Sequence, residues 1–165
     1  MRRRFYLSLG SNLGDRESNL RGAIGALGKL GEVAAVSSFY ETEPVEVVEQ
    51  PWFLNCAVAL DSDRTPLEVL QEILALENEM GRFRTQDKGP RNIDIDILLA
   101  GDVIVGTAEL TVPHPAMHER RFVLEPLAEI APGAMHPRLR KKISELLAHL
   151  PPGPMVRRLG EAPSG

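Results

Sequence analysis

The chain has 165 residues, of which 43% are hydrophobic and 25% charged, the balance of a soluble globular domain. A formal net charge of −4 and a pI of about 5.6 argue against general nucleic-acid binding, and no apolar run suggests a membrane span. A single cysteine, Cys56, cannot form an internal disulfide. We therefore expect a cytoplasmic monomer with one domain over 1–150 and a loosely held, proline-rich tail over 151–165.

The first half of the chain predicts a strand, a helix, two strands and a second helix. An apolar strand over 5–9 ends in a glycine turn, after which Asp15 can cap a helix that runs to about residue 30. Strands over 33–40 and 53–60 follow, separated by a polar loop. The sequence that starts at Thr65, Thr-Pro-Leu-Glu, combines a capping box with a proline at the first helical position and predicts another helix.

The second half of the chain adds one long strand and then mostly helical structure. Alternating apolar residues over 93–99 predict the strand. Short extended segments are expected near 103–105 and 109–112, and helices over 122–130 and 143–150. The order of the first six elements predicts an α+β, ferredoxin-like split β-α-β fold, an antiparallel sheet with helices on one face plus a helical C-terminal addition.

Two aspartates in the predicted strand over 93–99 are candidate metal ligands. Asp94 and Asp96 alternate with isoleucines, so both carboxylates share one face, with their side-chain bases roughly 7 Å apart. Two carboxylates at this separation repel each other, and a cation between them relieves this repulsion. Carboxylate oxygens are ligands that suit magnesium. The alternative is a strand whose polar face is simply hydrated.

A basic loop precedes these aspartates and contains Arg82, Arg84, Lys88 and Arg91. One arginine could complement the dipole of the preceding helix, but four cations exceed what that dipole needs. The alternative is a solvated basic loop. Guanidinium groups bind phosphate through paired hydrogen bonds, and beside acidic metal ligands they indicate a polyphosphate site.

Four further positions have side chains suited to binding a nucleotide or a flat heterocycle. Phe53 and Asn55 fall on the same face of a predicted strand, where a ring can stack and an amide can pair. His114, in a Pro-His-Pro turn, could donate to a phosphate. Glu77 lies on the apolar stripe of its helix, either at the edge of the core or within reach of a ribose hydroxyl or an arginine.

Several ordered sequence blocks together resemble one enzyme family, the 6-hydroxymethyl-7,8-dihydropterin pyrophosphokinases. The aspartate segment together with the Pro-Arg pair that precedes it is the most specific block, and Gly-Ser-Asn alone is weaker. The blocks that carry the resemblance are Leu9-Gly10-Ser11-Asn12-Leu13-Gly14, Val36-Ser37-Ser38-Phe39-Tyr40-Glu41-Thr42, Gln50-Pro51, Phe53-Leu54-Asn55, Glu77 with Gly81-Arg82, Gly89-Pro90-Arg91, Asp94-Ile95-Asp96, Val112-Pro113-His114, and Arg120 to Phe122.

The resemblance implies transfer of an intact pyrophosphoryl group from ATP to the hydroxymethyl oxygen of 6-hydroxymethyl-7,8-dihydropterin in folate biosynthesis, with release of AMP. It implies catalytic roles for Arg82, Arg91, Asp94 and Asp96, with the two aspartates holding two magnesium ions that bridge the triphosphate. A pterin slot is implied between Phe53 and Phe122, with Asn55 and the backbone near Thr42 and Val45 reading the pterin edge. The residues implied in ATP binding are Glu77, Arg82, Arg84, Lys88, Arg91, Ile97, Thr111, His114 and Arg120.

Two other function classes remain open at this point. Another magnesium-dependent nucleotidyl or phosphoryl enzyme on the same fold would share the aspartates but would not need the two aromatic rings. A nucleotide-sensing ferredoxin-like module would bind ATP without turning it over.

Overall fold

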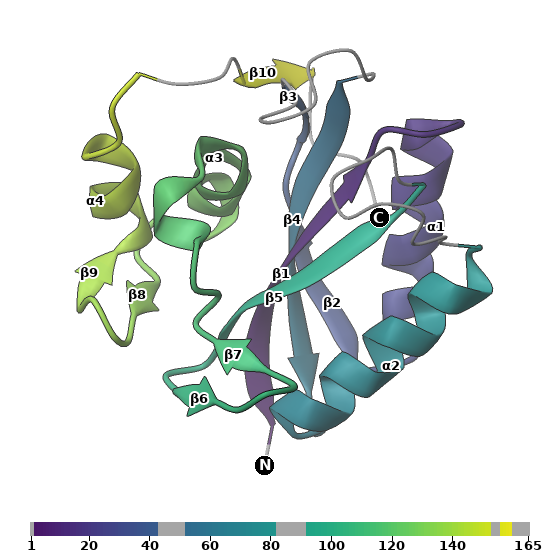
Figure 1. Ribbon diagram of the computed structural model, residues 1–165, viewed down its shortest axis with the longest axis horizontal. Coiled ribbons are helices and arrows are strands. Elements are labelled where there is room, and N and C mark those ends of the chain that lie inside the picture. Colours follow the sequence, from purple (N-terminus) through teal and green to yellow (C-terminus); the bar gives the residue numbers. More distant parts are fainter. Residues whose placement is uncertain (1, 43–51, 82–91, 153–155, 160–165) are drawn as a thin grey trace.

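The computed structural model describes residues 2–42, 52–81, 92–152 and 156–159. Its helices pack around one central sheet (Figure 1). The elements in chain order are β1 (Arg3–Ser11), α1 (Arg16–Leu27), β2 (Glu32–Val36), β3 (Phe39–Thr42), β4 (Phe53–Ser62), α2 (Pro66–Glu79), β5 (Asp94–Ala100), β6 (Val105–Gly106), β7 (Thr111–Val112), the short 3-10 helix η1 (Met117–Glu119), α3 (Arg121–Ile130), β8 (Met135–His136), β9 (Lys141–Lys142), α4 (Ile143–Ala148) and β10 (Val156–Leu159).

The central sheet is antiparallel and runs in the order β10-β3-β4-β1-β5, with β2 paired to β4 beside β3. The α+β class with an antiparallel sheet is therefore confirmed. β5 lies at one edge of the sheet, and α2 packs beside it (Figure 1). The short strands form two separate hairpin-like pairs, β6 with β7 and β8 with β9.

The two faces of the sheet are covered by different helices. On one face, α1 and α2 pack against inward-facing residues such as Phe5, Leu7 and Leu60. On the other face, α3 and α4 pack against Ala57 and Leu98, as the left side of Figure 1 shows. The helical C-terminal addition thus covers the second face of the sheet, and the arrangement with helices on one face holds only for α1 and α2.

The two helix caps that the sequence predicted are confirmed. Asp15 caps α1 by accepting a hydrogen bond from the Ser18 amide, at 3.1 Å. Thr65 and Glu68 form the predicted capping box at the start of α2. In the part of the chain that the structure describes, no helix has the length and apolar character needed to cross a membrane.

The single strand predicted over 33–40 is instead two strands, β2 and β3, interrupted at Ser37 and Ser38. Both serines are fully buried. The Ser37 hydroxyl accepts a hydrogen bond from the Ala57 amide at 2.8 Å and donates to the Ser38 carbonyl at 2.8 Å. A side chain therefore replaces part of the backbone ladder, which is the physical reason for the interruption.

The segment expected as a loosely held tail contributes a strand. Residues 156–159 form β10, which pairs antiparallel with β3 so that Val156 lies opposite Thr42 and Leu159 opposite Phe39. The C-terminal segment therefore covers the edge of β3 that would otherwise expose unpaired backbone groups.

Candidate functional site

The register of the sheet places an amide and a carboxylate on either side of a glycine. Gly10 of β1 lies opposite Asn55 of β4 on one side and opposite Asp94 of β5 on the other. Two residues back along β1, Ser8 lies opposite Asp96. Leu98 lies on the same face of β5 as Asp94 and Asp96, and it packs in the core beneath α3. The two aspartates therefore project toward the sheet face that α3 covers.

The carboxylates of Asp94 and Asp96 are half-buried and point to the same face, as the alternation predicted. The intervening Ile95 is buried in the core on the opposite face. Among the described residues, no group of three or more His, Cys, Asp or Glu side chains could hold a metal ion. The two carboxylates fit magnesium, because this ion needs few protein ligands and takes the rest from water and substrate phosphates.

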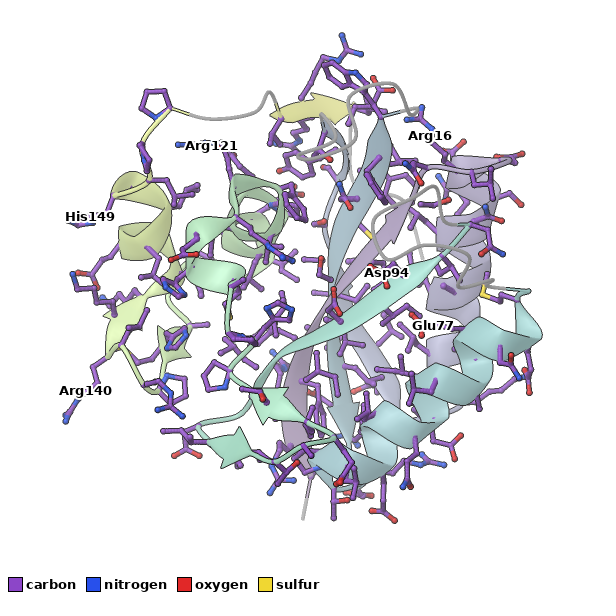
Figure 2. The ribbon with its side chains drawn as sticks, viewed as in Figure 1. Arg16, Glu77, Asp94, Arg121, Arg140 and His149 are labelled. Atoms are coloured by element: carbon purple, nitrogen blue, oxygen red, sulfur yellow. The ribbon has the colours of Figure 1, made fainter. Side chains whose placement is uncertain are left out.

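Glu77 holds the strand between the two aspartates in place. Its side chain is only 4% exposed and lies between α2 and β5 (Figure 2). One carboxylate oxygen accepts a hydrogen bond from the Ile95 amide at 2.8 Å, on the free edge of β5. Glu77 therefore fixes the backbone from which both metal-ligand candidates project. The sequence singled out Glu77, but a contact with a backbone amide leaves no pattern in the sequence, so this hydrogen bond could not be predicted.

His114 lies within electrostatic reach of Asp94 and Arg120. Its backbone amide donates to the Leu98 carbonyl at 3.0 Å, and its Nδ1 accepts from the Ala116 amide at 3.1 Å. Burial lowers the pKa of the imidazole, Arg120 lowers it further and Asp94 opposes this shift. Because Nδ1 is an acceptor, the neutral ring carries its proton on Nε2, which gives this atom the donor character that binding an anion requires.

We expect His114 to titrate below the ordinary histidine value of 6.5, so that it is neutral at pH 7. The unfolded chain then takes up this proton at a higher pH than the folded one. The stability contributed by the neutral ring is complete above about pH 6.5 and declines as the pH falls through that value toward the folded pKa. An NMR titration of the imidazole signals, assigned with His114→Gln, measures this shift. A folded-state value of 6.5 or higher would contradict the prediction.

Three of the residues implied in pterin binding, Thr42, Phe53 and Asn55, share one face of the sheet. Asn55 is buried, and its Nδ2 donates to Thr42 Oγ1 at 2.6 Å, which leaves its Oδ1 as an acceptor. Phe53 lies directly opposite Thr42 on β3. Both Phe53 and Phe122, at the start of α3, are half-buried rings. Phe53, Asn55 and Thr42 therefore lie together on the sheet face that is covered by α3, the helix to which Phe122 belongs.

Gly10 is required by this arrangement and was not singled out by the sequence. A Cβ atom on Gly10 would lie 2.6 Å from Asn55 Oδ1 and 3.5 Å from Cδ1 of Phe53. Contacts of 2.6 Å are too short for any side chain, so only glycine lets the Asn55 amide lie across β1. The Gly-Ser-Asn block was the available signal, but the sequence analysis took it as a turn after a strand over 5–9. β1 instead continues to Ser11 and pairs Gly10 with Asn55.

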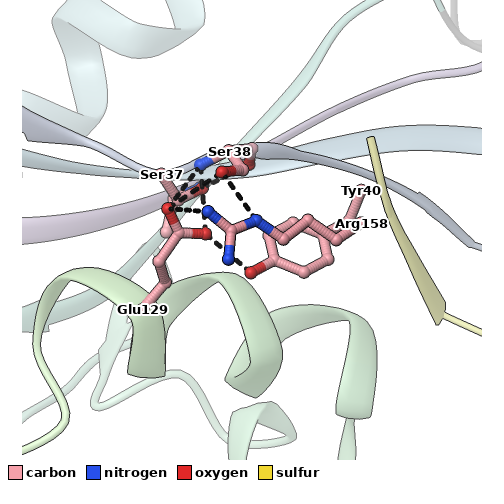
Figure 3. A network of polar contacts seen from close by, with 6 residues as sticks. Ser37, Ser38, Tyr40, Glu129 and Arg158 are labelled. Carbon is pink, nitrogen blue, oxygen red and sulfur yellow. Dashed lines mark hydrogen bonds and ion pairs between the residues drawn. The ribbon is translucent and has the colours of Figure 1, made fainter. Parts of the chain in front are cut away.

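A polar network joins α3 to β3 (Figure 3). Glu129 of α3 accepts hydrogen bonds from the Ser38 amide and hydroxyl at 3.0 Å and from the Tyr40 hydroxyl at 2.6 Å. Arg158 of β10 binds the Ser38 hydroxyl at 3.0 Å and pairs with Glu129 at 3.7 Å. Burial favours a higher Glu129 pKa, but the hydrogen bonds from Tyr40 and Ser38 outweigh it and hold the pKa below its usual value. The network holds the helix of Phe122 against the strand of Thr42.

The remaining expected site residues differ in how exposed they are and in whether the structure describes them. Ile97 has a side chain that is 5% exposed and packs in the core, so only its backbone is available to a nucleotide. Thr111 is exposed on β7, and Arg120 is exposed with its guanidinium carbon 5.7 Å from the Phe122 ring centroid. The expected residues that lie outside the described part of the chain are Val45, Arg82, Arg84, Lys88 and Arg91.

Comparison with known proteins identifies one family over most of the chain. The family model for 7,8-dihydro-6-hydroxymethylpterin-pyrophosphokinase matches residues 6–132. A 2-amino-4-hydroxy-6-hydroxymethyldihydropteridine pyrophosphokinase of Bacillus subtilis is 49% identical over 127 residues, 76% of each chain. The protein of the same name from Methylorubrum extorquens is 42% identical over 156 residues, 93% of this chain and 98% of its own.

Longer relatives contain this domain as one part. The folic acid synthesis protein FOL1 of Dictyostelium discoideum is 40% identical over 96% of this chain, which spans only 24% of that protein. The crystal structure of Plasmodium falciparum HPPK-DHPS with pteroate superposes with a TM-score of 0.70 at 17% identity, over 90% of this chain and 42% of that one. At this identity the structural likeness shows the fold alone.

Proposed function

The chain belongs to the 7,8-dihydro-6-hydroxymethylpterin-pyrophosphokinase family, and we propose that it transfers the pyrophosphoryl group of ATP to the hydroxymethyl oxygen of 6-hydroxymethyl-7,8-dihydropterin, releasing AMP, in folate biosynthesis. The order of β1, α1, β2 with β3, β4, α2 and β5 supports assignment of the core to the ferredoxin-like class.

The observation that carries this proposal is the row Asn55–Gly10–Asp94 across three neighbouring strands. It places the amide that would read the pterin two strands away from a carboxylate that would hold the metal of ATP. Neighbouring strands are about 4.8 Å apart, so the two sites are about 10 Å apart on one face. Both substrates can therefore be held side by side, and positioning two bound reactants is a large source of rate acceleration.

Asp94 and Asp96 are the residues that would hold magnesium, with two ions expected in the presence of ATP. Magnesium held by these carboxylates would supply positive charge to the triphosphate and favour in-line attack of the hydroxymethyl oxygen at the β-phosphorus. The Nε2–H of neutral His114 is available to donate to a phosphate oxygen on the same side. Arg82 and Arg91 are proposed to stabilise charge that develops on the oxygen leaving with AMP and to exclude water.

The pterin is proposed to stack between Phe53 and Phe122. The Asn55 Oδ1 would accept from the pterin edge, because Nδ2 already donates to Thr42. Such a slot selects a flat ring by shape and by its hydrogen-bonding pattern, and a buried amide left unpaired by a wrong ligand would disfavour that ligand.

Replacing Phe53 or Phe122 by alanine should weaken pterin binding by about 1–3 kcal/mol, because each change removes one stacking surface from the slot. ATP binding should barely change, since neither ring lies on β5. Equilibrium titration of each substrate measures both effects. Normal pterin affinity in both variants would show that the slot lies elsewhere.

The experiment that tests the proposed function is a product assay with ATP, magnesium and the hydroxymethylpterin. AMP that forms only when the pterin is present supports the proposal. ADP or free pyrophosphate as the main product would indicate the other class of magnesium-dependent phosphate enzyme. ATP binding without any product would indicate a nucleotide-sensing module.

A further inference from the structure

One arginine ties together the ends of two neighbouring strands behind the expected pterin slot. Arg16, the first residue of α1, donates from Nη1 to the Trp52 carbonyl and from Nη2 to Glu41 Oε2, each at 2.9 Å. Glu41 lies in β3, and Trp52 directly precedes β4. These bonds are partly buried, so they are less screened by solvent than ordinary surface ion pairs.

The C-terminal strand supplies a second arginine to the same carboxylate. Arg157 of β10 lies opposite Glu41 on β3 and donates to Glu41 Oε1. Its guanidinium carbon is also 6.0 Å from the Trp52 ring centroid. Both carboxylate oxygens of Glu41 are therefore occupied by arginines, one from each end of the chain. The hydrogen bonds from Arg157 and Arg16 outweigh burial and lower the pKa of Glu41, so it is ionised at neutral pH.

The residues next to these contacts belong to the expected slot. Thr42 follows Glu41, Phe53 follows Trp52, and the two are paired across β3 and β4. Side chains alternate between the faces of a strand, so Glu41 lies on the α1 face while Thr42 projects to the face of α3. Thr42 in turn receives the Asn55 amide. The arginine contacts thus fix the backbone on which the slot is built, and they do so from the opposite face of the sheet.

We infer that Arg16, Glu41 and Arg157 form a clamp that positions the pterin slot. This inference rests on the proposed function, and all three members are positioning residues that touch no substrate. The clamp acts on β3 and β4, whereas the metal-ligand candidates lie on β5, on the far side of β1. Loosening the clamp therefore weakens pterin binding selectively and leaves ATP binding intact.

The test uses the full-length protein with Arg16→Ala, Arg16→Lys, Glu41→Gln and Arg157→Ala. Pterin and ATP affinities are measured by equilibrium titration, and AMP formation gives KM and kcat. Arg16→Ala and Glu41→Gln should weaken pterin binding about 10-fold, since each removes charge-assisted bonds that fix the slot. ATP affinity should be unchanged. Arg16→Lys keeps the positive charge but not the two-pronged geometry of the guanidinium group. It should therefore retain part of the pterin affinity that Arg16→Ala loses.

The chain offers a matched control in the Arg4–Asp61 pair. It joins β1 to β4 near the opposite end of the same sheet through bonds of 2.8 and 2.9 Å. Its side-chain exposures of 48% and 15% resemble the 61% and 16% of Arg157 and Glu41. Arg4→Ala should therefore cost comparable stability without changing pterin affinity.

The results separate the clamp from the proposed function. The clamp would be overturned if Arg16→Ala left the pterin affinity unchanged or lowered the affinities for pterin and ATP equally. It would also be overturned if Arg4→Ala lost as much pterin affinity as Arg16→Ala. A wild-type protein that forms no AMP would instead contradict the proposed function.

Discussion

Replacing Asp94 or Asp96 by asparagine should leave a folded protein whose pyrophosphoryl transfer is at least about 1,000-fold slower, a loss of about 4 kcal/mol or more. Both carboxylates share one half-buried face of β5, with the Ile95 amide held by Glu77 between them. Asparagine keeps the shape of the side chain but removes its negative charge. The two side chains together then bind a magnesium ion beside a triphosphate much less strongly. Steady-state AMP formation at saturating substrates measures the loss.

The control for the aspartate variants is Asp61→Asn, a partly buried carboxylate on β4 that pairs with Arg4 near the opposite end of the sheet. It should keep its transfer rate even if it loses stability. The double variant of Asp94 and Asp96 should be little slower than either single one, because the two carboxylates act as a unit. A folded Asp96→Asn protein that forms AMP at a near-normal rate would refute the metal site.

Gly10→Ala should reduce pterin affinity by about 100-fold, because the new methyl group cannot coexist with the Asn55 amide in its present position. The added Cβ would lie 2.6 Å from Asn55 Oδ1, the acceptor proposed to read the pterin edge. ATP affinity should fall much less, since the residues implied in ATP binding lie on β5 and in the segments that precede and follow it, and not on β1 or β4. Titration of both substrates with the purified variant measures this difference.

Gly25→Ala is the matched control for Gly10→Ala. Gly25 lies within α1, where an added Cβ meets no atom within 4 Å. Alanine is the better helix former, so this variant should be neutral or slightly more stable and should bind the pterin normally. If Gly10→Ala also bound the pterin normally, the Asn55 amide would not be the reading group.

Elements with strong local signals could be predicted from the sequence, and elements fixed by distant partners could not. The Asp15 cap and the Thr65 capping box depend only on residues within one turn, and both are confirmed. The break between β2 and β3 depends on a hydrogen bond from Ala57 to Ser37. β10 follows a proline-rich segment and exists through pairing with β3, which the local composition does not reveal.

The same distinction applies to the site. Alternation alone placed Asp94 and Asp96 on one face, because strand geometry fixes this without any partner. The roles of Glu77 and Gly10 depend on which strand lies opposite, and this is set by the tertiary register. The site assignments for individual residues remain predictions that the variants above can test.

The central claim is that both terminal phosphates of ATP move together to the pterin, and the mass of the pterin product tests it most directly. The wild-type protein is incubated with magnesium, the hydroxymethylpterin and ATP labelled with ¹⁸O at the non-bridging oxygens of the β- and γ-phosphates. It should yield a pterin diphosphate that retains the label from both groups. Unlabelled AMP should form in equal amount. A pterin monophosphate, or an unmodified pterin beside hydrolysed ATP, would contradict the account.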